Sequence, residues 1–244
     1  MKTSIRFRER YSGWADSILV RDGLRKGELG PYDILDDEGH AYVLNQANAE
    51  VKVEHVEGKL VHPSMFRIAS FPQINVEDDL YLARDLAQHA REVSEDAIHE
   101  QEDHRLFSLL DAANQDYAED SAKRNHDPKL RSYLSKSGTL RVIAQLKNNF
   151  LSPCVFICNP VNEAAFRKFV SPVYPAYSVS TSPICPEGLS FITPPPAYLG
   201  VMPTFGFSEI ANPTPEQFRE GWVLSELIGM LILNPKGVGV LETR

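Results

Sequence analysis

The stretch that decides the fold is residues 75–113, NVEDDLYLARDLAQHAREVSEDAIHEQEDHRLFSLLDAA. It lies within residues 73–127, which contain no glycine and no proline and so no helix breaker. Asn75 can cap the free backbone amides, and the acidic residues 77–79 would follow in the first turn, where the helix dipole favours negative charge. Apart from a polar gap at Gln101, apolar residues then recur at spacings of three and four, which predicts one amphipathic helix from Asn75 to about Ala113. These apolar residues are Val76, Leu80, Ala83, Leu86 or Ala87, Ala90, Val93, Ala97, Ile98, Leu106, Phe107, Leu110 and Ala113.

The length of this helix limits the shape of the molecule. It would extend about 57 Å at 1.5 Å per residue, whereas the mean helix has only about 11 or 12 residues. A compact globule of 244 residues cannot enclose such a helix, which must either join a bundle or lie along an elongated molecule. Because no other segment matches it as a bundle partner, we expect an elongated molecule.

The N-terminal third is predicted to form an extended, β-rich arm. Strand-like runs occur at residues 41–44, 51–56 and 60–62, and polar turns that contain glycine join them. Residues 1–35 hold four glycines and charges of both signs, and they show no core pattern of their own. An extended arm or a long hairpin fits this region better than a packed domain.

The C-terminal half is predicted to be a mixed α/β domain. Short helices are expected at residues 139–149 and 161–170, and strands at residues 153–159 and 198–202. Residues 221–234, GWVLSELIGMLILN, are ambiguous between helix and strand. The fold class is therefore α+β. An arm and a long helix that cannot bury their apolar faces within one chain imply partner chains, so self-assembly is predicted.

Composition restricts the classes of function. With 43% hydrophobic and 24% charged residues, the chain is expected to be globular and soluble rather than disordered. No apolar run reaches the roughly 18 residues needed to span a bilayer. A net charge of −8 argues against a dedicated nucleic-acid-binding protein. Most of the acidity lies in residues 73–127, which carry 15 acidic and 5 basic residues, whereas residues 128–244 carry 7 and 10.

Residues that could act as nucleophiles or bind cofactors form no recognisable pattern. The three cysteines, Cys154, Cys158 and Cys185, do not have the spacing of a disulfide framework. Cys154 and Cys158 fall within a predicted buried strand, and we expect both to be small buried side chains. The sequence contains no Gly-x-Ser-x-Gly motif and no phosphate-binding or dinucleotide-binding glycine motif. We therefore predict no catalytic residue, no cofactor-binding residue and no cofactor.

The most prominent polar cluster lies on the predicted long helix and consists of Asp96, His99, Glu100, Asp103 and His104. Pairs three or four residues apart can face one direction, and the spacing is similar to the carboxylate-x-x-His motif of di-iron helix bundles. A di-iron site needs a second such helix, which the sequence lacks, and a zincin motif would need a histidine where Asp103 stands. We therefore favour a solvated polar face beside the apolar stripe, and we predict no metal ligand.

Four stretches, taken in order, resemble parts of one known family. They are EDHRLFSLLDAA at 102–113, CVFICNP at 154–160, YLGVMP at 198–203 and GWVLSELIGM at 221–230. The first is similar to the end of the spine helix, the second to a strand–Asn–Pro–helix step in the axial domain, and the last two to the closing strands. The family is that of the major capsid (head) proteins of tailed bacteriophages, whose fold encapsulin nanocompartments share.

The resemblance implies a domain arrangement. Residues 1–72 would form an N-terminal arm and extended β-hairpin loop, and residues 73–138 a peripheral domain with the long spine helix. Residues 139–220 would form the axial domain, and residues 221–244 strands that return to the peripheral domain. Because the chain begins almost at the loop, we expect the scaffolding segment that many members make and cleave to be absent or replaced by a separate scaffolding protein.

The resemblance also implies a function. Many copies would assemble into pentamers and hexamers of an icosahedral head that encloses double-stranded DNA without sequence-specific binding. The expected partners are other copies, a portal, scaffolding proteins and decoration proteins, with no membrane; the expected location is the virion, assembled in the cytoplasm of a host bacterium. An encapsulin-like nanocompartment shell is the first alternative, although residues 1–20 lack the amphipathic pattern of its cargo-docking helix. A metal-dependent enzyme that uses the cluster at residues 96–104 is the second.

Overall fold

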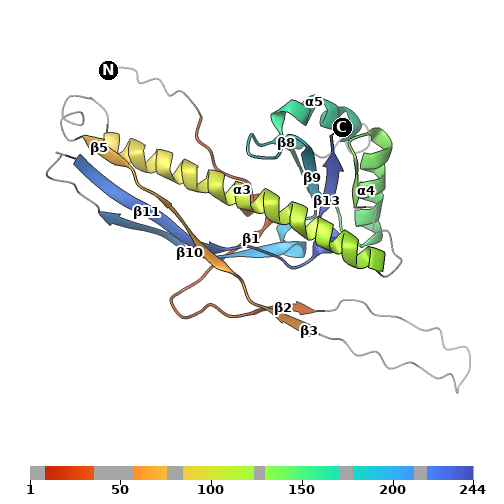
Figure 1. Cartoon of the computed structure of the whole chain (residues 1–244), viewed down its shortest axis with the longest axis horizontal. Helices are drawn as coiled ribbons and strands as arrows, with labels where there is room; N and C mark the ends of the chain where they lie inside the picture. Colours follow the sequence, from red (N-terminus) through yellow and green to blue (C-terminus); the bar gives the residue numbers. More distant parts are fainter. Residues whose placement is uncertain are drawn as a thin grey trace, which may run out of the picture.

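The computed structural model describes residues 9–35, 58–75, 85–123, 130–170, 178–211 and 219–243. One long helix, α3 (Leu86–Lys123), extends through the molecule (Figure 1). A first sheet follows its length, and a second sheet with two helices lies near its C-terminal end. A two-stranded hairpin projects away from both sheets. The molecule is therefore elongated along α3, as the sequence predicts.

The long helix is confirmed, but it begins later than predicted. α3 has 38 residues, and its first turn is held by Asp85, whose side chain accepts a hydrogen bond from the Gln88 amide at 2.9 Å. The predicted start at Asn75 is wrong, because Asn75 ends strand β5 (Gln73–Asn75) and pairs with Arg219. A helix-capping residue has extended backbone, so the capping pattern alone does not distinguish it from a strand end. Residues 76–84 lie outside the described residues.

The helix also ends later than predicted, at Lys123 rather than near Ala113. Its last turns lie against the second sheet through polar contacts. Asn114 donates a hydrogen bond to the Val238 carbonyl at 2.8 Å, and Asp111 forms an ion pair with Arg131 at 2.7 Å. Because polar contacts replace the apolar repeat here, the apolar pattern stops before the helix does.

Six of the described strands form the first sheet, in the order β1–β10–β11–β4, with β12 paired to β10 and β5 paired to β11. β1 is parallel to β10, and the other pairs are antiparallel. The bounds are β1 Val20–Gly23, β4 Met65–Ser70, β10 Gly200–Ala211, β11 Arg219–Gly229 and β12 Leu231–Ile232. Residues 221–234, left open by the sequence, are thus mainly strand, because neighbours on both sides of β11 satisfy its backbone groups.

A bulge in β10 changes its register with β11 between Thr204 and Phe207. Gly206 occupies the bulge with a left-handed φ of 74°, which glycine adopts without a steric penalty. Its amide donates to Thr204 Oγ1 at 2.9 Å, and the Thr204 hydroxyl in turn donates to Glu226 of β11. The bulge therefore directs a polar side chain at a buried carboxyl group.

Five described strands form the second sheet, in the order β6–β13–β9–β7–β8. The bounds are β6 Arg131–Tyr133, β7 Val155–Cys158, β8 Val179–Thr181, β9 Leu189–Thr193 and β13 Gly239–Glu242. The helices and 3-10 turns of this region are α4 Lys136–Asn148, α5 Glu163–Val170, η1 Pro160–Asn162, η2 Pro196–Tyr198 and η4 Pro235–Gly237. The predicted helices and the predicted strand at 153–159 are confirmed to within a few residues. Residues 221–244 contribute β11 to the first sheet and β13 to the second.

The N-terminal segment contributes residues to the core, although residues 1–35 show no core pattern of their own in the sequence. Helix α1 (Ala15–Ile18) and the residue after it bury Ala15, Ile18 and Leu19. These side chains share one apolar cluster with Leu106 and Phe107 of α3. A four-residue helix is too short to show a hydrophobic period, which is why the sequence pattern missed it.

The projecting hairpin consists of β2 (Tyr32–Leu35) and β3 (Gly58–Val61), which are antiparallel. The predicted strand at 60–62 overlaps β3, whereas the predicted strands at 41–44 and 51–56 lie outside the described residues. The Tyr32 hydroxyl donates to Asp22 at 2.5 Å and holds the base of the hairpin. An isolated two-stranded hairpin is marginally stable in water, so this one needs a further surface to lie on.

Candidate functional site: buried polar junctions and exposed apolar surfaces

The first polar junction joins the N-terminal segment to the middle of α3. Asp103 is fully buried, accepts the Trp14 amide at 2.9 and 3.0 Å, and accepts the Tyr11 hydroxyl. Tyr11 also lies 2.9 Å from the Ser182 hydroxyl, beyond β8. Burial raises the pKa of Asp103, although the two donors oppose that effect. We call these contacts the Asp103 junction; they fix residues 11–14 between α3 and the second sheet.

A second contact lies two turns earlier on α3. Arg10 donates to the buried carboxylate of Asp96 at 2.7 Å and to exposed Glu95 at 2.9 Å. The prediction of a solvated polar face is therefore wrong at Asp96 and Asp103, because the N-terminal segment covers both. The face is covered by a segment more than 80 residues away in the sequence. The spacing of residues on the helix carries no information about such a segment.

The structure does not bring the predicted polar cluster together as a metal site. Asp96 pairs with Arg10, Asp103 accepts Tyr11, and His104 is exposed. His99 lies 3.0 Å from the neighbouring Glu102. Within the described ranges, no group of three or more His, Cys, Asp or Glu side chains is placed to hold a metal ion.

The third junction is a buried carboxyl pair, Glu102 of α3 and Glu226 of β11, both almost fully covered. Arg21 of β1 reaches Glu226 at 2.7 Å and Glu102 at 3.5 Å. His99 contacts the other oxygen of Glu102, and Thr204 donates to Glu226. We call this arrangement the Glu102–Glu226 pair; it ties three strands of the first sheet to α3.

The pKa values of the two carboxyl groups of the pair are shifted in opposite directions. Burial and the neighbouring Glu102 raise the pKa of Glu226. Burial also acts to raise the pKa of Glu102, but the hydrogen bonds from His99 and Glu226 and the charge of Arg21 outweigh it, and that pKa is lowered. One oxygen of Glu226, Oε2, is buried without a protein donor. Of the two, Glu226 is therefore the one expected to take up a proton first as pH falls and so to become the neutral member.

The two buried cysteine thiols, Cys158 and Cys185, are not activated. Burial raises the pKa of Cys158 to about 11 and that of Cys185 to about 12, so both remain protonated thiols at neutral pH. Cys158 and Cys185 are buried, but Cys154 is exposed, and the prediction that it is buried is wrong. β7 begins one residue later, at Val155, so Cys154 lies outside the buried strand.

A depression of about 410 Å³ lies at the N-terminal end of α4 and includes Ser135, Ser137 and Arg141 in its lining. Ser135 caps α4 by accepting the Gly138 amide at 3.0 Å, so its hydroxyl has a structural role. The arrangement offers hydrogen-bonding groups and one cation rather than an activated nucleophile.

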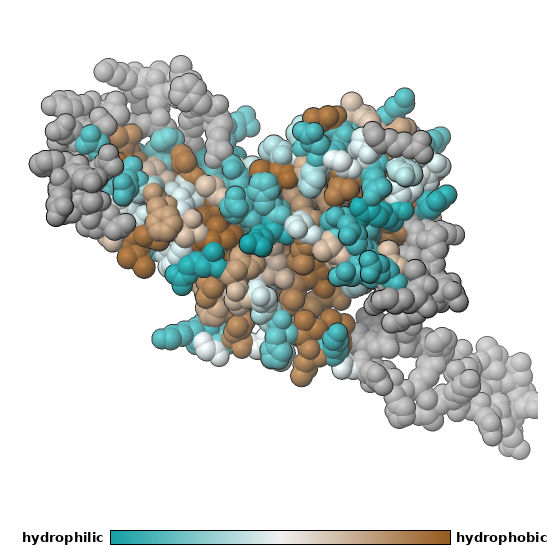
Figure 2. All heavy atoms as spheres, in the orientation of Figure 1, coloured by the Kyte–Doolittle hydropathy of each residue, from teal (hydrophilic) through white to brown (hydrophobic). Residues whose placement is uncertain are grey.

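Large apolar side chains are exposed on several elements. Figure 2 shows apolar residues gathered across the middle and lower part of one face, near the base of the hairpin. Among the described residues, the most exposed large hydrophobic ones are Phe150, Val161, Phe71, Tyr198, Leu60, Ile210 and Tyr133. Such surfaces on a chain with well-packed cores are typical of contacts with other protein chains. None of the helices in the described part of the chain combines the length and apolar character that crossing a bilayer requires.

The partners of these junctions are not predicted by the sequence pattern: Arg10, Tyr11, Trp14, Arg21 and Glu226. Of these residues, only Glu226 could have been identified as a buried polar group from the sequence. It is a single carboxyl group inside the apolar run GWVLSELIGM, and a buried acid needs a partner or a proton. The other four lie in a segment that shows no periodicity.

Comparison with solved structures shows where this fold occurs. A chain of Microbacterium phage Oxtober96 superposes with a TM-score of 0.73 and 7% identity, covering 100% of this chain and 95% of that chain. The capsid structure of Cyanophage P-SCSP1u gives a TM-score of 0.69 and 8% identity, with coverage of 100% and 93%. The holo encapsulin complex from Synechococcus elongatus gives 0.62 and 11%, with coverage of 99% and 91%. No protein-family model and no curated protein matches the sequence.

These matches establish the fold, because they cover nearly the whole of each chain at low sequence identity. They confirm the α+β class and the resemblance seen in the sequence. The four stretches that carried the resemblance fall, in order, in α3, in β7 with η1, at the start of β10 and in β11.

Proposed function

We propose that this chain, which has the fold shared by bacteriophage capsid proteins and encapsulins, assembles with copies of itself into a closed protein shell. The observation that carries the proposal is the structural match along the full chain, which covers 100% of it and 93% of the cyanophage capsid chain. Two features of the chain itself support it. Hairpin β2–β3 needs an external surface, and large apolar side chains lie exposed on both sheets and on the hairpin.

The specific function that we propose is that of a major capsid protein in a phage head. Copies would form pentamers and hexamers of an icosahedral shell around double-stranded DNA, in a virion assembled in the host cytoplasm. A portal, scaffolding proteins and decoration proteins would be the further partners. In this arrangement residues 1–72 would include the arm and hairpin loop, residues 73–138 would form the peripheral domain, residues 139–220 the axial domain, and residues 221–244 the returning strands.

An encapsulin-like cargo shell is the second candidate, and the match to the Synechococcus elongatus encapsulin complex favours it. In the described N-terminal segment, α1 has only four residues and its apolar side chains face the core of its own chain, so α1 itself is not free to dock cargo. The contents of shells purified from the natural source discriminate between the two: genomic double-stranded DNA supports the phage head, and a packaged protein supports the nanocompartment.

The acidic segment that contains α3 fits a shell that does not bind its enclosed DNA electrostatically. Residues 73–127 carry 15 acidic and 5 basic residues, and Asp116 and Glu119 of α3 are exposed. We expect empty shells to bind DNA weakly at low salt. Tight binding whose affinity falls steeply with salt concentration would contradict this part of the proposal.

The decisive experiment is the size of the purified full-length chain in solution. Light scattering and negative-stain electron microscopy should show closed particles far larger than a single chain of 27.4 kDa. A monodisperse monomer at high concentration, under conditions that permit assembly, would refute shell formation.

A further inference from the structure

Among the described residues, four have left-handed backbone, and three of them are glycines: Gly13, Gly27 and Gly206. The fourth is Phe150, with φ 58°. A residue with a Cβ is strained in this region, and a bulky aromatic residue is an outlier there. Three of these four left-handed positions therefore hold glycine, and Phe150 is the exception.

The backbone at Phe150 is fixed by the end of α4. The Phe150 amide donates to the Lys147 carbonyl at 2.9 Å, and the Leu151 amide donates to the Leu146 carbonyl at 2.9 Å. These two bonds form a Schellman motif, in which the strained position is occupied by glycine or asparagine in most proteins. Leu146 and Leu151 are both buried, so the turn is required for packing. The choice of phenylalanine is not.

The Phe150 side chain is not stabilised by packing against its own chain, so the backbone strain is not compensated there. Phe150 is 98% exposed, whereas the next most exposed large hydrophobic residue, Val161, is 74% exposed. An isolated exposed apolar residue needs no explanation. An exposed aromatic ring at a position that prefers glycine carries two costs at once, and such conflicts mark functional positions.

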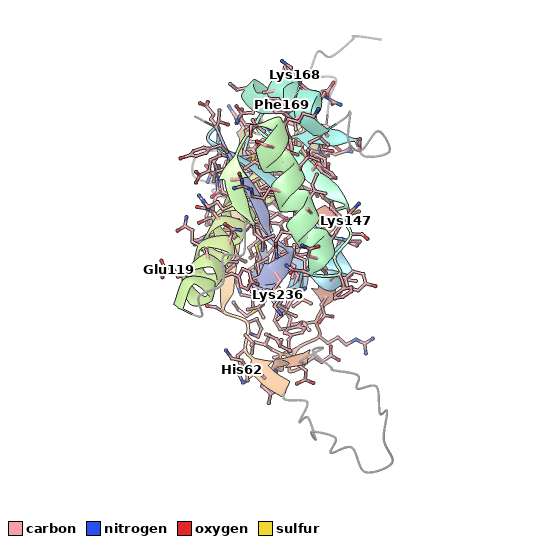
Figure 3. The ribbon with its side chains drawn as sticks, turned by 90° about the vertical axis from the view of Figure 1, so that its right-hand side faces the viewer. His62, Glu119, Lys147, Lys168, Phe169 and Lys236 are labelled. Carbon is pink, nitrogen blue, oxygen red and sulfur yellow. The ribbon has the colours of Figure 1, made fainter. Side chains whose placement is uncertain are left out.

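The surroundings of Phe150 are basic. Lys147 precedes it by one helical turn, and Asn149 donates to the Lys236 carbonyl at 3.2 Å. Figure 3 shows Lys147 and Lys236 near the lower end of α4, with Glu119 of α3 at the opposite edge of the same face. An aromatic ring with a charged rim is typical of an energetically important contact residue.

We propose that Phe150 is an anchor side chain in the contact between neighbouring copies of this chain, an inference that rests on the shell-forming function proposed above. Neighbours in a ring make head-to-tail contacts, in which one edge of a copy meets a different edge of the next. Lys147 and Lys236 adjoin Phe150, and the exposed Asp116 and Glu119 of α3 on a second copy offer carboxylates of complementary charge. Burial of the ring at this contact offsets both costs.

Four forms of the full-length chain test the proposal: the wild type, Phe150→Gly, Phe150→Asn and the matched control Phe150→Tyr. Size-exclusion chromatography and negative-stain microscopy measure the protein concentration at which half of the chain is assembled. We expect this concentration to rise about tenfold or more for the glycine and asparagine variants. It should stay within about twofold of the wild type for tyrosine, which keeps the ring.

The stability of the unassembled chain should change in the opposite direction. Below the assembly threshold, Phe150→Gly and Phe150→Asn should melt about 2 °C or more above the wild type, because they relieve the left-handed strain. A gain in melting temperature together with a loss of assembly supports the anchor, since damage to folding would lower both.

Three results would overturn the inference. Glycine and asparagine variants that assemble at the wild-type concentration would show that the ring is dispensable, while leaving shell formation intact. Variants that lose both stability and assembly would show that Phe150 acts within its own chain. A wild-type chain that never assembles would refute the proposed function and, with it, this contact.

Discussion

Two successive stretches of α3, residues 94–103 and 106–110, are buried in opposite ways. Apart from Ile98, the covered face of residues 94–103 is polar, and we call this stretch the polar half; its buried polar residues are Ser94, Asp96, Glu102 and Asp103. The covered face of residues 106–110 is apolar, and we call this stretch the apolar half; its buried residues are Leu106, Phe107 and Leu110. An apolar face needs only to be covered, whereas every buried oxygen needs a particular partner. The apolar half therefore contributes stability, and the polar half determines which segments attach to the helix and where.

The largest effect is expected in the apolar half. Phe107 is buried and stacks on Phe191 with ring centroids 5.6 Å apart. Phe107→Ala should lower the free energy of unfolding by about 4 kcal/mol, because it removes buried apolar surface and leaves a cavity. Urea unfolding below the assembly threshold measures this. Val93→Ala, at an exposed position on the same helix, is the control and should change stability by no more than about 0.5 kcal/mol. Equal effects at the two positions would contradict the comparison.

A smaller but still large effect is expected at the Glu102–Glu226 pair. Arg21→Met should cost about 3 kcal/mol, because it leaves buried carboxyl groups without their cation. Arg21 also pairs with Asp16, at 2.6 Å, but the Asp16 side chain is 63% exposed. Asp16→Asn therefore serves as the matched control and should cost no more than about 0.5 kcal/mol. If the control costs as much as Arg21→Met, the buried pair is not what Arg21 stabilises.

The Asp103 junction should give the next effect, confined to one segment. Asp103→Ala should cost about 2 kcal/mol, because the part-buried Trp14 amide loses its acceptor and the Tyr11 hydroxyl keeps only Ser182. Limited proteolysis with mass spectrometry should show faster cleavage within residues 9–14, while the second sheet stays resistant. Tyr11→Phe removes one of the two donors and should have about half the effect. Uniform loss of protection along the whole chain would show that the junction does not act locally.

The sequence predicts the parts of this fold that depend on periodicity. The apolar half of α3, helix α4 and strand β7 all bury residues that their local patterns single out, because burial of a repeating face is a local property of the chain. The order of elements was also sufficient to indicate the capsid-like fold, although no curated protein matches the sequence.

The sequence does not predict the polar junctions, for a physical reason. Asp103 and Tyr11 are 92 positions apart, and Arg21 and Glu226 are 205 apart, so each pair is defined only by the folded chain. The same polar residues on α3 fit a solvated face, a metal site or a buried junction equally well in a helical pattern. These three interpretations are distinguished only by the N-terminal segment that covers the helix. That segment has no pattern of its own in the sequence, because its helix α1 is too short to show one.

The smallest expected effect gives the sharpest test of the polar half. If Glu226 is the neutral member of the pair, Glu226→Gln replaces a protonated carboxyl group with an amide that can also donate to Glu102. The change in stability should then stay within about 1 kcal/mol near pH 5, although Glu226 is fully buried. Loss of a buried, charged partner would instead cost about 3 kcal/mol or more.

The pH dependence of the stability of Glu226→Gln tests whether Glu226 is neutral or charged in the folded chain. Because the pKa of Glu226 is raised above its ordinary value of 4.5, its contribution to stability is present below that value and is lost as pH rises through the raised pKa. Glu102, whose pKa is lowered, has the reverse dependence, since its contribution is lost only as pH falls. Glu226→Gln removes the pH dependence that comes from Glu226 and keeps the one that comes from Glu102. The variant should therefore gain stability relative to the wild type as pH rises above 4.5, as followed by urea unfolding. A relative loss over this range would mean that Glu226 is charged in the folded chain and that its ion pair with Arg21 outweighs its burial.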